Sequence, residues 1–218
     1  MQRILIVTDY YLPGYKGGGP VRTISNTVEW LGDEFAFCVL AGDRDFKDSQ
    51  PYSSVRPGQW TPVGKAQVRY LTPDERRFGA LGRVIAGTGY DLLYVNSFFA
   101  PMCAKTVLLH GLRRIPRDRP LLLNPRGEFN PGSLGHKGLK KRAYLTLIHA
   151  LNLAGDIHWQ AASEGELANI RREFPGLRRD PARGMVVPNL PRRLDGEPPA
   201  PAVREPGQPL RIAFLSRV

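Results

Sequence analysis

Arg126 and Glu128 follow directly after the apolar run 120–125, a position from which side chains can do chemistry. An arginine at the end of a strand can bind a phosphate or a carboxylate through two parallel hydrogen bonds. The neighbouring Glu128 could orient that guanidinium group or contact the hydroxyl groups of a substrate. Both residues are therefore candidates for a ligand site, and the alternative is an Arg–Glu pair that only fixes a loop.

A second candidate is the glycine-rich segment YLPGYKGGGPVR, which lies between an expected strand and an expected helix. Gly17, Gly18 and Gly19 allow close approach to a ligand, and the N-terminus of the helix favours an anion. Pro20 suits the first helical turn, where its missing N–H is harmless. The segment lacks G-x-G-x-x-G and a P-loop Lys-Ser/Thr pair, which argues against a dinucleotide site. A tight structural turn remains the alternative.

Short apolar runs alternate with segments of helical period, and this alternation predicts an α/β fold. Several runs are apolar throughout, as in a sheet that is covered on both faces. We expect a Rossmann-like, doubly wound parallel sheet with helices on both faces. The expected strands are 4–8, 35–41, 66–71, 91–96, 120–125, 156–161 and 184–188. The expected helices are 20–31, 74–87, 101–113, 136–154 and 163–173, and residues 42–65 are expected to form a long surface excursion.

In such a sheet, ligands bind beyond the carboxyl ends of the strands. The segments 9–20, 96–99, 126–135 and 162–166 should therefore meet at one edge. The substrate-facing candidates in them, and at the start of the basic helix that follows, are Gly17, Gly18, Gly19, Asn96, Ser97, Arg126, His136, Lys137 and Glu164.

Composition shifts divide the chain into three parts. Residues 1–190 carry the alternating pattern and form an expected N-terminal domain. Residues 191–209 are rich in proline and poor in large apolar side chains, so we expect an extended linker. Residues 210–218 (LRIAFLSRV) are expected to be the first strand of a second, truncated domain.

The chain has 218 residues, a formal net charge of +11 and a sequence pI of about 10.0, which attracts polyanions and phosphorylated molecules. Cys38 and Cys103 lie in apolar surroundings and are expected to be reduced core residues. No signal-peptide pattern and no membrane-spanning run is apparent. We expect a soluble cytoplasmic protein, or one bound to a membrane surface at most.

The expected helix 136–154 has two features of its own. Leu139, Ala143, Leu147 and Leu151 recur at i, i+4 spacing, with Tyr144 and Ile148 alongside, and predict a stripe that faces the core. Its basic start, which contains Lys137, Lys140, Lys141 and Arg142, could rest on anionic lipid or receive a phosphorylated acceptor. A solvated helix start is an equal alternative.

Together these segments resemble the N-terminal domain of retaining glycosyltransferases of family 4 (glycosyl transferases group 1), which have the two-domain GT-B fold. The likeness runs in order through nearly the whole chain. It is carried by YKGGGPVR, NSFF, NPRGEFNPGSLGHKGLKK, ASEGE, VVPNLP and LRIAFLSRV, of which the PRGE-to-KK stretch is the most specific.

The resemblance implies transfer of a sugar from a nucleotide-sugar to an acceptor that the N-terminal domain holds. Arg126 and Glu128 are the expected catalytic residues, with Arg126 as the best local substitute for a histidine of the family, and Arg217 matches the family's arginine that neutralises the donor diphosphate. It implies no metal and no cofactor besides the nucleotide-sugar substrate. Two departures stand out: many members carry a histidine where Pro125–Gly127 stand here, and the usual Asn-Gly is Asn189–Leu190.

The expected function is therefore acceptor binding in a glycosyltransferase at the cytoplasmic side of polysaccharide or glycolipid synthesis. The acceptor would be a glycan or a lipid-linked molecule. The donor-binding carboxylates of the family belong to a C-terminal half that lies beyond this chain, so we expect the chain by itself to be inactive as an enzyme. The runner-up is a non-catalytic α/β module that docks anionic lipid or a protein through its basic face. Specific nucleic-acid binding is not expected, because the basic residues are not interleaved with exposed aromatic side chains.

Overall fold

The computed structural model describes residues 1–135, 138–193 and 196. Eight strands form one sheet in the order β3-β4-β2-β1-β5-β6-β7-β8. The strands are β1 Arg3–Val7, β2 Ala36–Gly42, β3 Trp60–Val63, β4 Ala66–Leu71, β5 Leu92–Val95, β6 Leu121–Leu123, β7 His158–Ala161 and β8 Gly184–Val186. Every pairing is parallel except that of β3 with β4.

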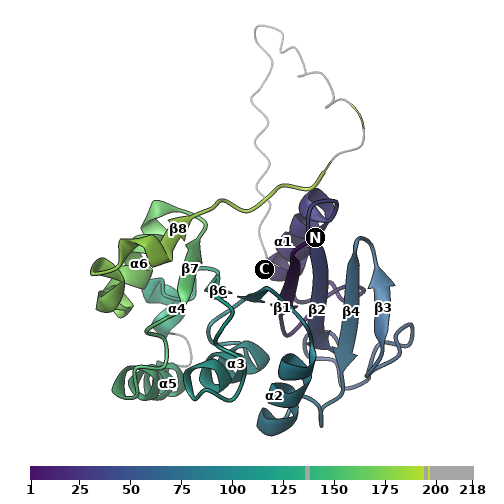
Figure 1. The fold of residues 1–218 in the computed structure, drawn as a ribbon, viewed down its shortest axis with the longest axis horizontal. Helices are drawn as coiled ribbons and strands as arrows, with labels where there is room; N and C mark the ends of the chain where they lie inside the picture. Colours follow the sequence, from purple (N-terminus) through teal and green to yellow (C-terminus); the bar gives the residue numbers. More distant parts are fainter. Residues whose placement is uncertain (136–137, 194–195, 197–218) are drawn as a thin grey trace, which may run out of the picture.

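Six α-helices are described, together with two short 3-10 helices at Pro175–Arg178 and Pro181–Arg183. The α-helices are α1 Gly19–Leu31, α2 Phe78–Gly87, α3 Pro101–Gly111, α4 Pro131–Gly135, α5 Gly138–Ala150 and α6 Glu164–Glu173. Figure 1 shows α1 on one side of the strands and α2, α3 and α5 on the other. The Rossmann-like α/β class and the helices on both faces are thus confirmed.

Two apolar cores lie against the two faces of the sheet. The smaller one packs Ile24 and Val28 of α1 against Ile6, Phe37 and Val39. The larger one joins the opposite face to α2, α3, α5 and α6, and its widest part is a group of aromatic rings around Phe98. Phe98 and Phe99 follow β5 and Phe129 follows β6, so the contacts among their rings join the loops that follow those two strands.

The prediction that residues 42–65 form a long surface excursion was wrong in part, because the end of this segment forms strand β3. β3 is an antiparallel edge strand whose four residues pair with β4, Trp60 with Arg69 and Val63 with Ala66. The proline at position 62 is tolerated there because an edge strand leaves one side without ladder hydrogen bonds. The sheet is therefore mixed at this edge and parallel elsewhere.

The expectation of a core-facing stripe on the helix 136–154 was also wrong. Its described part contains α5, whose buried residues are Leu145 and Ile148. Of the two residues expected alongside the stripe, Ile148 is buried and Tyr144 is partly buried against the core. Leu139, Leu147 and Leu151 are 86%, 43% and 54% exposed, and Ala143 is exposed as well. The side of the helix that packs on the protein is the one next to the predicted stripe. The leucines that the periodicity assigned to the core are therefore exposed to solvent.

A strap formed by residues 187–191 leaves β8 and crosses toward α1. Gln160 Nε2 donates to the carbonyl oxygen of Val187, Asn26 Nδ2 to that of Leu190, and Trp30 Nε1 to that of Pro191. This strap ends the part of the chain expected to be the N-terminal domain. Of the expected linker 191–209 only 191–193 and 196 are described, and the expected strand 210–218 lies outside the described residues.

Candidate functional site

Three of the four strand-end segments, 9–20, 96–99 and 126–135, meet in one hollow of about 310 Å³, called the cleft below, whereas the segment 162–166 contributes no residue to its lining. It opens beyond the carboxyl ends of β1, β5 and β6, where the parallel topology collects the loops that follow these strands. Its lining consists of Thr8, Asp9, Tyr10, Lys16, Gly17, Pro20, Val21, Phe46, Asn96, Ser97, Ala100, Arg126 and Glu128. Five residues singled out in the sequence therefore lie together there, namely Gly17, Asn96, Ser97, Arg126 and Glu128.

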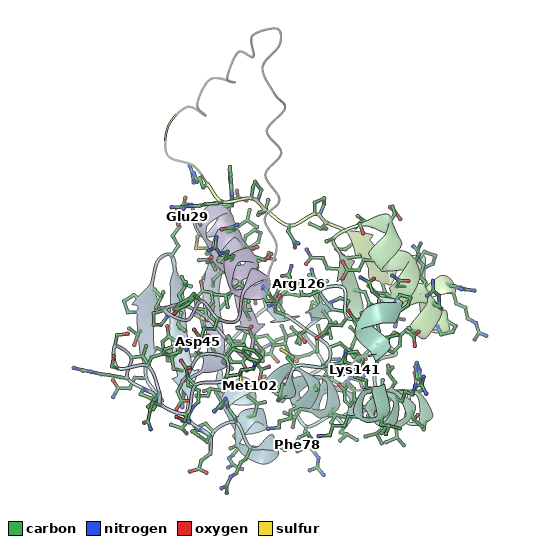
Figure 2. The ribbon with its side chains drawn as sticks, turned by 180° about the vertical axis from the view of Figure 1, so that it is seen from behind. Glu29, Asp45, Phe78, Met102, Arg126 and Lys141 are labelled. Atoms are coloured by element: carbon green, nitrogen blue, oxygen red, sulfur yellow. The ribbon has the colours of Figure 1, made fainter. Side chains whose placement is uncertain are left out.

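Arg126 lies near the middle of the molecule, between α1 and the half that holds α6 (Figure 2). Its guanidinium donates three hydrogen bonds to neutral oxygens: Nε to Asn96 Oδ1 at 2.6 Å, one terminal nitrogen to the Tyr94 hydroxyl at 3.0 Å, and the other to Asn189 Oδ1 at 2.5 Å. Burial lowers the pKa of this guanidinium. Among the described residues no carboxylate lies within ion-pair distance of it, although the nearby Glu166 carboxylate raises its pKa. An anion in the cleft would therefore meet a cation whose hydrogen bonds all go to neutral oxygens.

Asn96 and Asn124 fix the base of Arg126 and keep donor capacity of their own. Asn124 Oδ1 accepts from the Arg126 backbone N–H, and Asn96 is 2% exposed. The Nδ2 groups of both asparagines are buried without a partner in the described part of the chain. Since buried donors are normally satisfied, the Asn96 amide at the wall of the cleft points to a ligand acceptor.

Glu128 ties the loop after β5 to the loop after β6. Its carboxylate accepts from Ser97 Oγ at 2.7 Å and from the backbone N–H groups of Phe98 and Phe99 at 2.6 and 3.2 Å. Burial raises the pKa of Glu128 against the lowering effect of these donors. The geometry gives Glu128 a positioning role at the cleft wall, because its oxygens are already engaged within the protein.

Two residues of the cleft adopt backbone conformations that L-residues rarely adopt. Ser97 has φ 150° and Arg126 has φ 55°. Such strain persists only where the surroundings hold it, and it gathers at functional sites. Here the carboxylate of Glu128 holds Ser97 and the side chain of Asn124 holds Arg126.

The acidic residue of ASEGE that reaches the site region is Glu166. Glu164 is exposed and does not line the cleft. Ser163 accepts from the Glu166 N–H as an N-cap, the first half of a capping box. The carboxylate of Glu166, however, accepts from the N–H groups of Gly127 and Ala162, at 2.5 and 2.7 Å. It thereby holds the turn that carries Arg126.

The glycine-rich loop is shaped by a carboxylate from a distant part of the chain. Asp45 Oδ2 accepts from the backbone N–H groups of Tyr15 and Lys16, at 2.8 and 3.0 Å. A Cβ at Gly17 would lie 2.9 Å from atoms of Tyr10 and Val21, and Gly18 has φ 72°. Gly18 is also the N-cap of α1 and offers no side-chain cap. The loop thus needs Gly17 and Gly18, whereas Gly19 has open space around it, and the N-terminus of α1 at the cleft has no side-chain cap.

Asp9, Tyr10 and Phe46 line the cleft although none of them is among the candidates named from the sequence; Asp9 and Tyr10 lie in the segment 9–20 that was expected at this edge. Asp9 is 8% exposed and accepts from the backbone N–H of Met102 at the start of α3, with both oxygens. Burial raises the pKa of Asp9, while Met102, Cys103 and Arg76 work to lower it. The position of Asp9 directly after the first strand could have identified it as a cleft residue. Phe46 reaches the cleft from a long loop, and no pattern in the sequence predicts that approach.

Replacing Asp45 with asparagine is expected to loosen the glycine-rich loop and to cost about 1–3 kcal/mol, since charge-assisted hydrogen bonds are lost. Burial works to raise the pKa of Asp45, but the N–H groups of Lys16, Phe46 and Tyr15 lower it below its ordinary 3.8. Its stabilising effect is therefore full above that value and is lost as the pH falls through the lowered one.

The measurement is an acid titration of the Tyr15 and Lys16 amide signals by NMR, alongside denaturant unfolding. Both signals should titrate with an apparent pKa below 3.8, and Asp45→Asn should abolish the transition. Asp48→Asn removes only a half-exposed ion pair with Lys16 and serves as the control, with an expected loss under about 1 kcal/mol. Equal behaviour of the two variants would contradict the assigned role of Asp45.

Three candidates from the sequence cannot be placed: His136, Lys137 and Arg217 lie outside the described residues. Within the described ranges no group of three or more His, Cys, Asp or Glu side chains could hold a metal ion. In the same ranges no helix has the length and apolar character required to cross a bilayer.

Comparison with known protein families yields no matching family model. Comparison with curated proteins yields no match either. The cleft and its chemistry are therefore the basis for assigning a function.

Proposed function

We propose that this chain is the acceptor-binding domain of a retaining glycosyltransferase that uses a nucleotide-sugar as donor. The observation that carries the proposal is the cleft at the carboxyl edge of the sheet, where Arg126 presents a half-buried guanidinium whose hydrogen bonds all go to neutral oxygens. The resemblance of the motifs to family 4 enzymes selects this chemistry among those that an anion-binding cleft allows.

Sugar transfer breaks the bond between the sugar and a nucleoside diphosphate and forms a bond to an acceptor oxygen. Negative charge develops on the departing diphosphate, so fixed positive charge and N–H donors in a dry site lower the barrier. The cleft supplies Arg126, the Asn96 amide and the uncapped N-terminus of α1 for this purpose. Glu128 and Glu166 hold the two loops that aim these donors.

The acceptor in this proposal is a glycan or a lipid-linked saccharide at the cytoplasmic face of the membrane. Hydroxyl-bearing and anionic parts of such an acceptor find matching groups in Asn96 and Arg126. The proposed reaction also needs groups that bind the donor. The resemblance assigns this role to Arg217, which lies outside the described residues, and to the donor-binding carboxylates of the family.

The experiment is a transfer assay with the complete reading frame that encodes this chain. UDP-, GDP- and ADP-sugars are incubated with soluble and lipid-linked saccharide acceptors, and the products are identified by mass spectrometry. We expect one donor to be consumed with release of its nucleoside diphosphate and addition of one sugar to an acceptor. Absence of transfer, together with absence of nucleoside diphosphate binding to the chain, would contradict the proposal.

A further inference from the structure

Two adjoining hollows open where the loops that precede β6, β7 and β8 meet, at the amino edge of the sheet. The first, of about 400 Å³, lies between the end of α5, the start of β7 and the two 3-10 helices. The second, of about 410 Å³, lies between the loop after α3 and the loop before β7. Asn152, Gly155 and Arg183 line both hollows, and neither hollow shares a lining residue with the cleft at the carboxyl edge.

The first hollow, called the aromatic hollow below, has a wall of three rings. The ring centroids of Trp159 and Phe174 are 4.6 Å apart with 34° between the ring planes, and those of Phe174 and His149 are 5.0 Å apart with 39°. Trp159 is buried and His149 is exposed, so the rings form a ladder from the core to the surface. A further planar ring can stack against such a wall, and the bases of nucleotides do so in many sites.

Four guanidinium groups line the aromatic hollow and the second hollow, called the arginine hollow below: those of Arg113, Arg117, Arg179 and Arg183. Two of them are paired, since Asp156 accepts from Arg117 Nε at 2.9 Å and Asp180 accepts from Arg183 Nε at 2.6 Å. The other two are exposed, and no carboxylate of the described chain lies within ion-pair distance of either. Each hollow therefore contributes one cation whose charge is not paired.

We propose that the two hollows together bind one nucleotide. Its base lies against the ring wall of the aromatic hollow, and its phosphate group lies in the arginine hollow in contact with Arg113. Arg179 adds a second unpaired positive charge from the adjoining hollow. The site does not depend on the proposed transferase activity, because none of its residues lines the cleft.

Size and charge select a nucleotide over smaller ligands. Sites for small molecules usually measure about 300–1,000 Å³, so the two hollows together suit a ligand larger than a phosphate ion. Inorganic phosphate would leave the ring wall uncovered, and an uncharged aromatic molecule would leave both cations unpaired. A nucleotide has a planar base and an anion that guanidinium groups bind through parallel hydrogen bonds. Its ribose can cross the shared wall at Asn152 and Gly155.

The test titrates the chain with AMP, GMP, adenosine, guanosine and inorganic phosphate, followed by NMR of backbone amides and by calorimetry. We expect AMP or GMP to shift the signals of Asn152, Gly155 and Gly176, and to bind more weakly as salt rises. The same nucleotide should bind about tenfold or more tightly than its nucleoside or phosphate alone, since only the nucleotide uses both hollows.

The double variant Arg113→Glu/Arg179→Glu removes the two unpaired cations and should raise the Kd of the nucleotide about tenfold or more. Both side chains are exposed, so circular dichroism should show an unchanged fold. The matched control is Arg22→Glu/Arg56→Glu, which makes the same change of net charge at two exposed arginines that line neither hollow. This control should keep binding, apart from the small general effect of net charge.

His149→Ala removes the exposed ring of the ladder and should weaken binding of the nucleotide, whereas His149→Phe keeps a ring there and should restore it. Arg126→Gly removes the cation of the cleft and should leave the shifts at Asn152, Gly155 and Gly176 intact.

The proposal would be overturned if neither nucleotide shifted these three signals at millimolar concentration, or if inorganic phosphate bound as tightly as the nucleotide. Equal losses in Arg113→Glu/Arg179→Glu and its control would overturn it as well. Binding that Arg126→Gly abolishes and Arg113→Glu/Arg179→Glu leaves unchanged would assign the nucleotide to the cleft instead. Sugar transfer by the complete reading frame is a separate measurement, so failure of this site leaves the proposed function standing.

Discussion

Replacement of Arg126 by alanine is expected to lower kcat/KM of the proposed sugar transfer about 100-fold or more. The half-buried guanidinium donates its hydrogen bonds to neutral oxygens and forms no ion pair in the described chain, so its charge can stabilise an anion in the cleft. Removal of one such preorganised donor typically costs a factor of about 10²–10³ in rate. The loss should appear in the affinity for nucleoside diphosphate as well, if the leaving group is the anion that Arg126 contacts.

The measurement is steady-state kinetics with the complete reading frame, and titration calorimetry with the nucleoside diphosphate. Arg126→Gly is the second variant, because a φ of 55° suits glycine and relieves backbone strain while it removes the same cation. Arg83→Ala, on the exposed side of α2, is the control. A lower melting temperature with unchanged kinetics would show that Arg126 only clamps Asn96, Tyr94 and Asn189 together.

Replacement of Phe98 by alanine is expected to cost about 3–5 kcal/mol of unfolding free energy. The Phe98 ring is fully buried and contacts five other aromatic rings, with centroid distances from 5.1 to 5.8 Å. Its removal leaves a cavity that rigid neighbouring rings cannot fill by relaxing. Domains are stable by only about 5–15 kcal/mol in total, so this single change takes a large share.

Urea unfolding followed by tryptophan fluorescence measures the loss, since Trp159 belongs to the same cluster. Phe78→Ala is the control: that side chain is 38% exposed at the start of α2, and its removal should cost under about 0.5 kcal/mol. Equal small losses in both variants would mean that the cluster is loosely packed. The Phe98 backbone N–H bonds Glu128, so Phe98→Ala should also loosen the cleft.

The local pattern of the sequence was sufficient for the class of fold and for the edge at which the site lies. Apolar runs alternating with helical segments require a parallel sheet, and a parallel sheet brings every strand's carboxyl end to one edge. Gly17, Asn96, Ser97, Arg126 and Glu128 each follow an apolar run, so their meeting in one cleft was predictable.

The sequence did not predict which side chains form hydrogen bonds with which loops at that edge of the sheet. Ser163 and Glu166 are spaced for a capping box, yet the Glu166 carboxylate turns to the Gly127 N–H, 39 residues away in sequence. Asp45 reaches the glycine-rich loop across about thirty residues, and no spacing in the sequence signals it. Such contacts depend on which loops the completed sheet brings within hydrogen-bond distance.

The sequence by itself determined that α5 is a helix, that the chain folds as an α/β sheet and that Arg126 stands at a strand's end. Only the tertiary structure decided which side of α5 is buried and which carboxylate meets which loop. The physical reason is that the spacing of apolar residues along α5 gives two neighbouring stripes, and the sequence alone does not indicate which of the two packs against the core. The position of α5 at the margin of its layer buries Leu145 and Ile148 and leaves Leu139, Leu147 and Leu151 in contact with solvent.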